Sequence, residues 1–97
     1  MCGAPAQELS LEGIDVGKES VVQGTVSKGG QPLPGAYVRL LDASGEFTAE
    51  VVSSPEGHFR FFAAPGEWTV RALHRTGNGE TKVTAEGAGL HPVAVEL

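Results

Sequence analysis

Cysteine, methionine, tryptophan and tyrosine each occur only once in this chain of 97 residues. The single cysteine, Cys2, has no partner within the chain, so no internal disulfide holds the fold together. No stretch approaches the roughly 18 consecutive apolar residues that a membrane-spanning helix requires. The first residues lack the basic and apolar regions of a secretory signal. Together these absences predict a soluble protein of the cytoplasm.

Basic residues are also few. Seven Lys and Arg stand against twelve Asp and Glu, which gives a formal net charge of −5. A domain that binds nucleic acid through its phosphates is usually basic, and anionic membrane surfaces attract basic segments in the same way. The charge balance therefore argues against nucleic acid and against a membrane surface as partners.

Turn-forming residues, in contrast, are abundant. Fourteen glycines and six prolines predict frequent turns and many short strands. Residues 1–18 predict a flexible tail, and residues 19–97 one domain. Within it, seven segments alternate between apolar and polar positions: 20–27, 36–42, 46–53, 58–62, 67–74, 81–85 and 90–97. Their spacing predicts an all-β fold, a seven-stranded antiparallel Greek-key sandwich.

The alternation also predicts which side chains share a face of each strand. Two groups of apolar residues are expected to face the core: Phe59 and Phe61, and Trp68, Val70 and Ala72. Val38 and Leu40 share one face of residues 36–42. Phe47 is expected on the same face as Ala49 and Val51, with Glu50 on the opposite face. Residues 76–79 contain Asn-Gly, which predicts a turn.

Two stretches resemble a known kind of domain. Residues 24–26 with 30–40, and residues 57–61 with 65–70, are similar to carboxypeptidase regulatory-like domains, over residues 20–73. The resemblance implies a transthyretin-like (prealbumin-like) sandwich. Trp68 stands where that family usually has Tyr, and Ser54-Pro55 replaces its usual turn Asp.

A second resemblance runs over nearly the whole chain. It is carried by residues 1–3, 38–42, 45–51, 59–64 and 68–73. These resemble a small actinobacterial (SseC-like) family of unknown function, whose members are encoded beside a thiosulfate sulfurtransferase and are linked to sulfur metabolism. The resemblance implies that context, and our first hypothesis is therefore a non-catalytic accessory protein that binds such a sulfurtransferase.

Cys2 provides a chemical hypothesis for that context. Removal of Met1 would leave the Cys2 thiol beside the α-ammonium group, which favours the thiolate. Such a thiolate could accept sulfane sulfur from a sulfurtransferase persulfide. In the alternative interpretation, Cys2 only begins the tail.

The outward face of three predicted strands is the second candidate. If these strands are neighbours, they share seven residues: Tyr37, Arg39, Leu41, Arg60, Phe62, Arg71 and Leu73. Arginines among exposed apolar groups are typical of a partner or homodimer surface, and they could also bind a small oxyanion. Alternatively, they form ordinary cross-strand ion pairs with Glu46, Glu50 or Glu67.

No pattern predicts an enzyme. His58, His74 and His91 are far apart, and no spacing resembles a zinc site. No carboxylate pair, nucleophile motif or cofactor motif is present, so we expect no catalytic residue, metal or cofactor. The alternative to the sulfur-linked accessory protein is a generic interaction or small-ligand module. A carbohydrate-type ligand would stack on Tyr37 and Phe62.

Overall fold

The computed structural model describes residues 20–97. The predicted tail over residues 1–18, and Cys2 within it, lie outside the described residues. The described part has no helix and eight strands. These strands are β1 (Ser20–Lys28), β2 (Gln31–Pro32), β3 (Tyr37–Leu41), β4 (Phe47–Val52), β5 (His58–Phe62), β6 (Gly66–His74), β7 (Gly77–Ala85) and β8 (Gly89–Glu96). The all-β prediction is confirmed for this part, with eight strands instead of seven.

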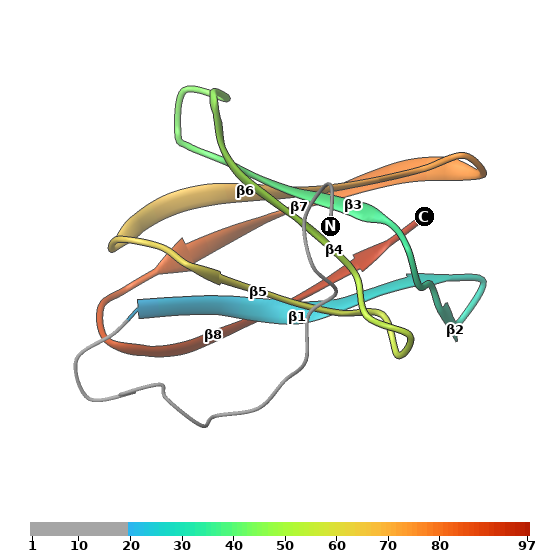
Figure 1. The fold of residues 1–97 in the computed structure, drawn as a ribbon. Coiled ribbons are helices and arrows are strands. Elements are labelled where there is room, and N and C mark those ends of the chain that lie inside the picture. Colours follow the sequence, from blue (N-terminus) through green and yellow to red (C-terminus); the bar gives the residue numbers. More distant parts are fainter. Residues whose placement is uncertain (1–19) are drawn as a thin grey trace, which may run out of the picture.

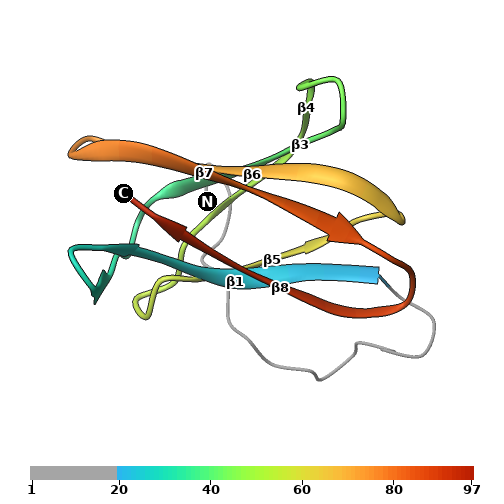
Figure 2. The same ribbon diagram turned by 180° about the vertical axis from the view of Figure 1, so that it is seen from behind.

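The strands form two four-stranded sheets that lie one above the other (Figures 1 and 2). One sheet has the order β4-β3-β6-β7. In the other, β1 is central, with β5 and the short β2 along one edge and β8 along the other. Pairing is antiparallel except between β1 and β8, which are parallel and in register from Ser20 with Gly89 to Ser27 with Glu96. This corrects the antiparallel prediction: β7 belongs to the first sheet, so the chain crosses between layers before β8 returns in the direction of β1.

The core lies between the two sheets. The fully or nearly fully buried side chains there include Phe59, Phe61, Val70 and Leu40, as the alternation predicts. Phe59 and Phe61 project from the same face of β5, with ring centroids 6.0 Å apart. Each such side chain contributes about 1.5–3 kcal/mol by leaving water. Trp68 is half-buried against this core, and its Nε1–H donates to the carbonyl of Ala64 at 2.8 Å.

Two serines, Ser53 and Ser54, form hydrogen bonds with the backbone where β4 leads to β5. Both are buried. The Ser53 hydroxyl accepts from the backbone N–H of Ala36 (2.9 Å) and donates to the carbonyl of Leu33 (2.8 Å). The Ser54 hydroxyl accepts from the backbone N–H of His58 at 3.0 Å. Ser54 therefore supplies a side-chain acceptor in this turn. The carboxypeptidase regulatory-like domains that the sequence resembles usually have an Asp there.

Two local expectations are wrong. Leu40 pairs with Ala49 and Leu41 with Phe47, so Thr48 is an extra residue, a β-bulge. The bulge reverses the alternation and turns Phe47 to the outer face, where 61% of it is exposed. The predicted turn over residues 76–79 is also wrong. The turn is at residues 75–76, and Asn78 lies within β7, paired with Leu73.

The side of the sandwich formed by β7 and β8 is closed by direct contact between the sheets. A Cβ atom on Gly79 would lie 2.4 Å from the carbonyl oxygen of Glu96, so only glycine fits there. Nearby, the hydroxyl of Thr81 donates to the carbonyl of Ala94 at 3.0 Å. This close approach explains why the Asn78-Gly79 pair is held in a strand and does not form the turn.

Candidate functional site

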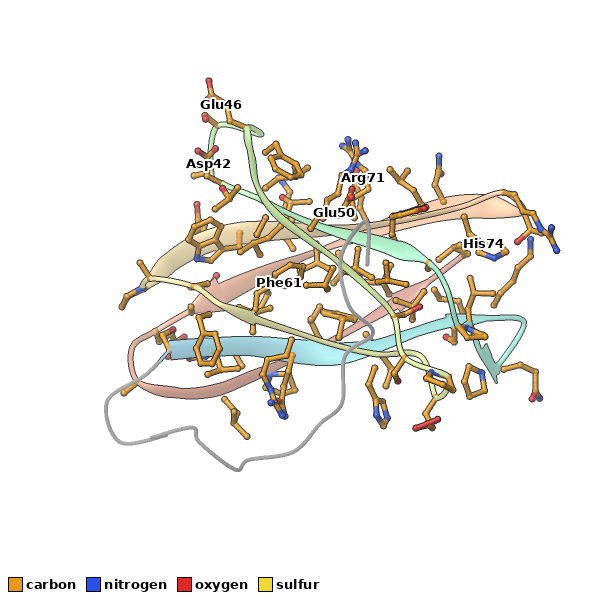
Figure 3. The ribbon with its side chains drawn as sticks, viewed as in Figure 1. Asp42, Glu46, Glu50, Phe61, Arg71 and His74 are labelled. Atoms are coloured by element: carbon orange, nitrogen blue, oxygen red, sulfur yellow. The ribbon has the colours of Figure 1, made fainter. Side chains whose placement is uncertain are left out.

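The outer face of the β4-β3-β6-β7 sheet carries a row of four charged side chains. Directly opposite residues on antiparallel strands share a face of the sheet. Here the register aligns, in order across the sheet, Glu50, Arg39, Arg71 and Glu80. Arg39 Nε lies 2.7 Å from the Glu50 carboxylate, and Arg71 Nη2 lies 3.2 Å from that of Glu80. Figure 3 shows Glu50 and Arg71 on this outer side, with Phe61 between the layers. We call these four residues the charged row.

A second row, beside the first, is largely apolar. It aligns Val52, Tyr37 and Leu73 across β4, β3 and β6. Tyr37 is 53% exposed. The face is hollowed on both sides of Leu73, with a hollow of about 440 Å³ toward Tyr37 and one of about 290 Å³ toward Glu80. We call Val52, Tyr37 and Leu73 the apolar row.

Phe47 extends the same face beyond the charged row, and sequence reasoning missed it. The guanidinium carbon of Arg39 lies 6.0 Å from the centre of the Phe47 ring, within range of a cation–π interaction. Leu41, which pairs with Phe47, belongs to this face by alternation but is only 5% exposed. Leu41 is therefore corrected from a surface residue to a buried one. Phe47 faces outward because of the β-bulge, and the alternation of apolar residues gives no sign of that bulge.

The seven predicted surface residues do not form one surface. Arg60 and Phe62 lie on β5, which pairs with β1 in the other sheet. Arg60 Nε donates to the side-chain oxygen of Gln23 at 3.0 Å, while its buried Nη2 has no partner among residues 20–97. Phe62 is 62% exposed on that opposite sheet. The structure thus brings together Tyr37, Arg39, Arg71 and Leu73, and separates Arg60 and Phe62 from them.

Both arginines of the charged row already have a carboxylate partner. Of the three carboxylates named as alternative ion-pair partners, Glu50 pairs with Arg39, whereas Arg71 pairs with Glu80, which was not among them. A small oxyanion at this row would have to displace those carboxylates. The ion-pair interpretation therefore fits the charged row better than the oxyanion interpretation, and the face as a whole has exposed aromatic rings beside paired charges.

Asp42 holds the β3–β4 turn at one end of this face. Its carboxylate accepts from the hydroxyl and backbone N–H of Ser44 and from the backbone N–H of Glu46 (2.6, 2.9 and 3.0 Å). These hydrogen bonds, the Ser44 hydroxyl first, lower the pKa of Asp42 below its ordinary value of 3.8. Figure 3 shows this turn, with Asp42 and Glu46, rising from the sheet.

Two histidines take part in local hydrogen bonds. His91 Nε2 lies 2.7 Å from the carbonyl of Gly87, and His74 Nδ1 accepts from the backbone N–H of Thr76 at 3.2 Å. Among residues 20–97 there is no group of three or more His, Cys, Asp or Glu side chains that could hold a metal ion. Over the same residues, no helix has the length and apolar character needed to cross a membrane.

Comparison with known proteins places the chain among relatives. It is 56% identical over 99 residues to the uncharacterized proteins Rv0814c and Rv3118 of Mycobacterium tuberculosis, covering all of this chain and 99% of each relative. It is 59% identical over 86 residues to an uncharacterized protein of Mycolicibacterium smegmatis, covering 88% of this chain and 96% of that one. The model of the family described as "Protein of unknown function (DUF1416)" matches residues 2–97. The chain therefore belongs to the DUF1416 family.

Proposed function

We propose that this chain is a non-catalytic accessory protein that binds a protein partner through the outer face of its β4-β3-β6-β7 sheet. The observation that supports this most directly is the exposure of two aromatic rings, Tyr37 and Phe47, on the same face as Arg39 and Arg71. Aromatic residues and arginine are enriched among the interface residues that contribute most of the binding energy, and exposed apolar patches commonly mark interaction sites.

The proposed partner is a thiosulfate sulfurtransferase, and the proposed place of action is the cytoplasm. The support for both is the sequence resemblance to the sulfurtransferase-associated family. The charged row lies beside the apolar row, and its alternating positive and negative groups would orient a partner bound there.

Cys2 is the proposed sulfur acceptor. Its deprotonated thiol attacks the outer sulfur of the enzyme's cysteine persulfide, and the proton goes to solvent. A new S–S bond forms on Cys2, the S–S bond of the enzyme persulfide breaks, and its electron pair leaves with the enzyme thiolate. No oxidant or reductant is consumed, since the sulfane sulfur passes unchanged from one thiolate to the other.

We also propose that the sandwich is of the transthyretin-like Greek-key type. The support is the motif resemblance over residues 20–73 and the arrangement in which β3 and β6 pair at the centre of one sheet while β1 lies at the centre of the other.

The test of partner binding is capture and titration with matched face variants. The full chain is immobilised and challenged with the purified sulfurtransferase from the same cells. Tyr37→Asp or Phe47→Asp should reduce the affinity at least about tenfold, the effect of losing one interface anchor worth about 1.4 kcal/mol. Phe62→Asp is the matched control, because Phe62 is equally exposed but lies on the opposite sheet. No binding, or equal loss in all three variants, would refute the proposed face.

The sulfur-transfer step has its own measurement. The chain is incubated with the enzyme and thiosulfate, and its intact mass is compared with that of the Cys2→Ser variant. Gain of one sulfur atom by the unmodified chain alone is the expected result. Equal masses in the two chains would show that Cys2 is not an acceptor, even if partner binding is found.

A small-ligand module is the second candidate. The predicted pair of stacking aromatics, Tyr37 and Phe62, lies on opposite sheets, so the two rings cannot hold one sugar. Tyr37 and Phe47 remain as aromatics on a single face. A glycan-array signal that disappears in Tyr37→Ala would favour this function over partner binding.

A further inference from the structure

A hollow lies at one end of the outer face, beside the turn between β6 and β7. It is about 440 Å³ in volume and is lined by Gly35, Tyr37, Leu73, His74 and Arg75. We call it the turn hollow. Figure 3 shows His74 at the opposite end of the sheet from Asp42 and Glu46. The turn hollow is shallow and largely open to solvent, so it offers a small molecule one face to pack against.

The walls of the turn hollow suit a flat apolar group. Tyr37 and Leu73 are direct cross-strand neighbours on β3 and β6, so a ring and an aliphatic side chain lie side by side. Gly35 leaves the adjoining space open: its φ is +73°, and no atom lies within 4 Å of the position that a Cβ would take. An aromatic body could therefore lie against Tyr37 and Leu73 with one edge over Gly35, where a larger residue would block it.

The rim of the turn hollow is basic, although the whole chain is acidic. Arg75 lines it, and none of the ion pairs within residues 20–97 involves Arg75. Lys28 brings a second positive charge to the same turn, because its ammonium group donates to the carbonyl of Thr76. No carboxylate lines the turn hollow. Its charge is therefore not neutralised in the way that Glu50 and Glu80 neutralise the charged row.

His74 also lines the turn hollow, and its ring is held within the turn. Its Nδ1 lies 2.8 Å from the hydroxyl oxygen and 3.2 Å from the backbone nitrogen of Thr76. The other polar side chains that line the hollow are the guanidinium of Arg75 and the hydroxyl of Tyr37, which can both donate hydrogen bonds.

We propose that the turn hollow is a binding site for a small aromatic carboxylate. The aromatic body packs on Tyr37 and Leu73, and the carboxylate pairs with Arg75. An inorganic oxyanion fits less well, because the Tyr37 and Leu73 walls offer it no hydrogen bonds, and a neutral aromatic molecule would leave Arg75 without a counter-charge. This inference goes beyond the partner-binding function, and it singles out Arg75, which lies outside both rows.

The test uses 2-naphthoate as the probe and the full chain as the receptor. A titration followed by amide chemical shifts should move the signals of Gly35, Leu73 and Arg75 first. The neutral analogue 2-naphthalenemethanol should bind at least about fivefold more weakly, because it lacks the charge that Arg75 recognises. Equal binding of the two probes, or shifts centred on Phe62 and β5, would overturn the proposal.

Arg75→Gln and Arg60→Gln form the matched pair of variants. Arg75 is an exposed turn residue, so its substitution should leave the amide spectrum of the fold intact. Arg75→Gln should weaken naphthoate about fivefold or more, and Arg60→Gln, on the opposite sheet, should not change it. Unchanged binding in Arg75→Gln refutes the site. Capture of the sulfurtransferase by Arg75→Gln should be normal, so failure of this proposal is distinguishable from failure of partner binding.

Discussion

Arg39 and Arg71 lie directly opposite each other on β3 and β6, with Glu50 on the far side of one and Glu80 on the far side of the other. Like charges placed directly across strands are destabilising. The two outer carboxylates offset that repulsion, since each forms an ion pair with the nearer guanidinium. The four side chains therefore act as one electrostatic unit, and the loss of one carboxylate exposes the repulsion between the two cations.

Glu50→Gln should destabilise the fold by about 0.2–1 kcal/mol, the range of exposed ion pairs. Adding Arg71→Gln should recover part of that loss, because the second cation is then gone. Urea unfolding measures both effects, at low salt and at about 1 M NaCl, where the Debye length is about 3 Å. The salt should remove most of the difference between the unmodified chain and Glu50→Gln. If Glu50→Gln loses the same stability at both salt concentrations, Glu50 stabilises the fold by packing and not by its charge.

Ser53 should be the most sensitive serine of the described part. Ser53→Ala removes the acceptor of the buried Ala36 N–H and the donor to the Leu33 carbonyl. A buried group left without its partner costs about 1–3 kcal/mol, so the urea midpoint should fall accordingly. Ser27→Ala, a half-buried position on β1, is the control and should change stability by less than about 0.5 kcal/mol. Similar midpoints for the two variants would show that water replaces the Ser53 hydroxyl.

Asp42 should make the β3–β4 turn sensitive to acid. Its folded pKa is lowered, so its contribution to stability is fully present above the unfolded value of 3.8 and is lost as pH falls through the lower folded pKa. Asp42→Asn keeps a side-chain oxygen acceptor but cannot titrate. The stability advantage of the unmodified chain over Asp42→Asn should therefore shrink between pH 5 and acid conditions below pH 3.8. Urea unfolding across this range measures it, and an advantage that grows in acid would contradict the assigned hydrogen bonds.

The alternation of apolar residues predicts the core well but the sheet arrangement poorly. Burial of Phe59, Phe61 and Val70 follows from a period of two residues, which is a local property of any strand with one buried face. Strand pairing is not local. Nothing in the residues of β5 specifies that it pairs with β1 and not with β3. The sequence therefore predicts one surface for three arginines, whereas Arg60 lies on the other sheet.

Local exceptions to the alternation were equally hidden. The outward turn of Phe47 depends on the bulge at Thr48, next to a turn in which the Asp42 N–H donates to the Glu46 carbonyl at 2.9 Å. The strand conformation of Asn78 depends on the approach of β8 to Gly79. The first exception arises within the β3–β4 hairpin and the second from a contact with β8. Neither is visible in the alternation of apolar residues, which therefore predicts the wrong face and the wrong turn.

Gly24, the single glycine of β1, should not tolerate a side chain. A Cβ atom there would lie 1.5 Å from the carbonyl oxygen of Val93, so Gly24→Ala forces β8 away from β1. Because, among the described strands, β8 pairs only with β1, this displacement disrupts the whole parallel pair. The free energy of unfolding should fall by about 3 kcal/mol or more. The control is Gly30→Ala. Gly30 has a φ of +81° but open space around it, so only backbone strain of about 1–2 kcal/mol is expected.

Urea unfolding followed by Trp68 fluorescence compares the two variants, and amide exchange along residues 89–96 reports the β1–β8 pairing directly. Faster exchange in β8 of Gly24→Ala, with near-normal exchange in Gly30→Ala, is the expected pattern. If both variants unfold at the same urea concentration, the contact between Gly24 and Val93 is not what holds β8 in place. The parallel pairing would then have to depend on the side chains that β8 contributes to the core, chiefly Val93 and Val95.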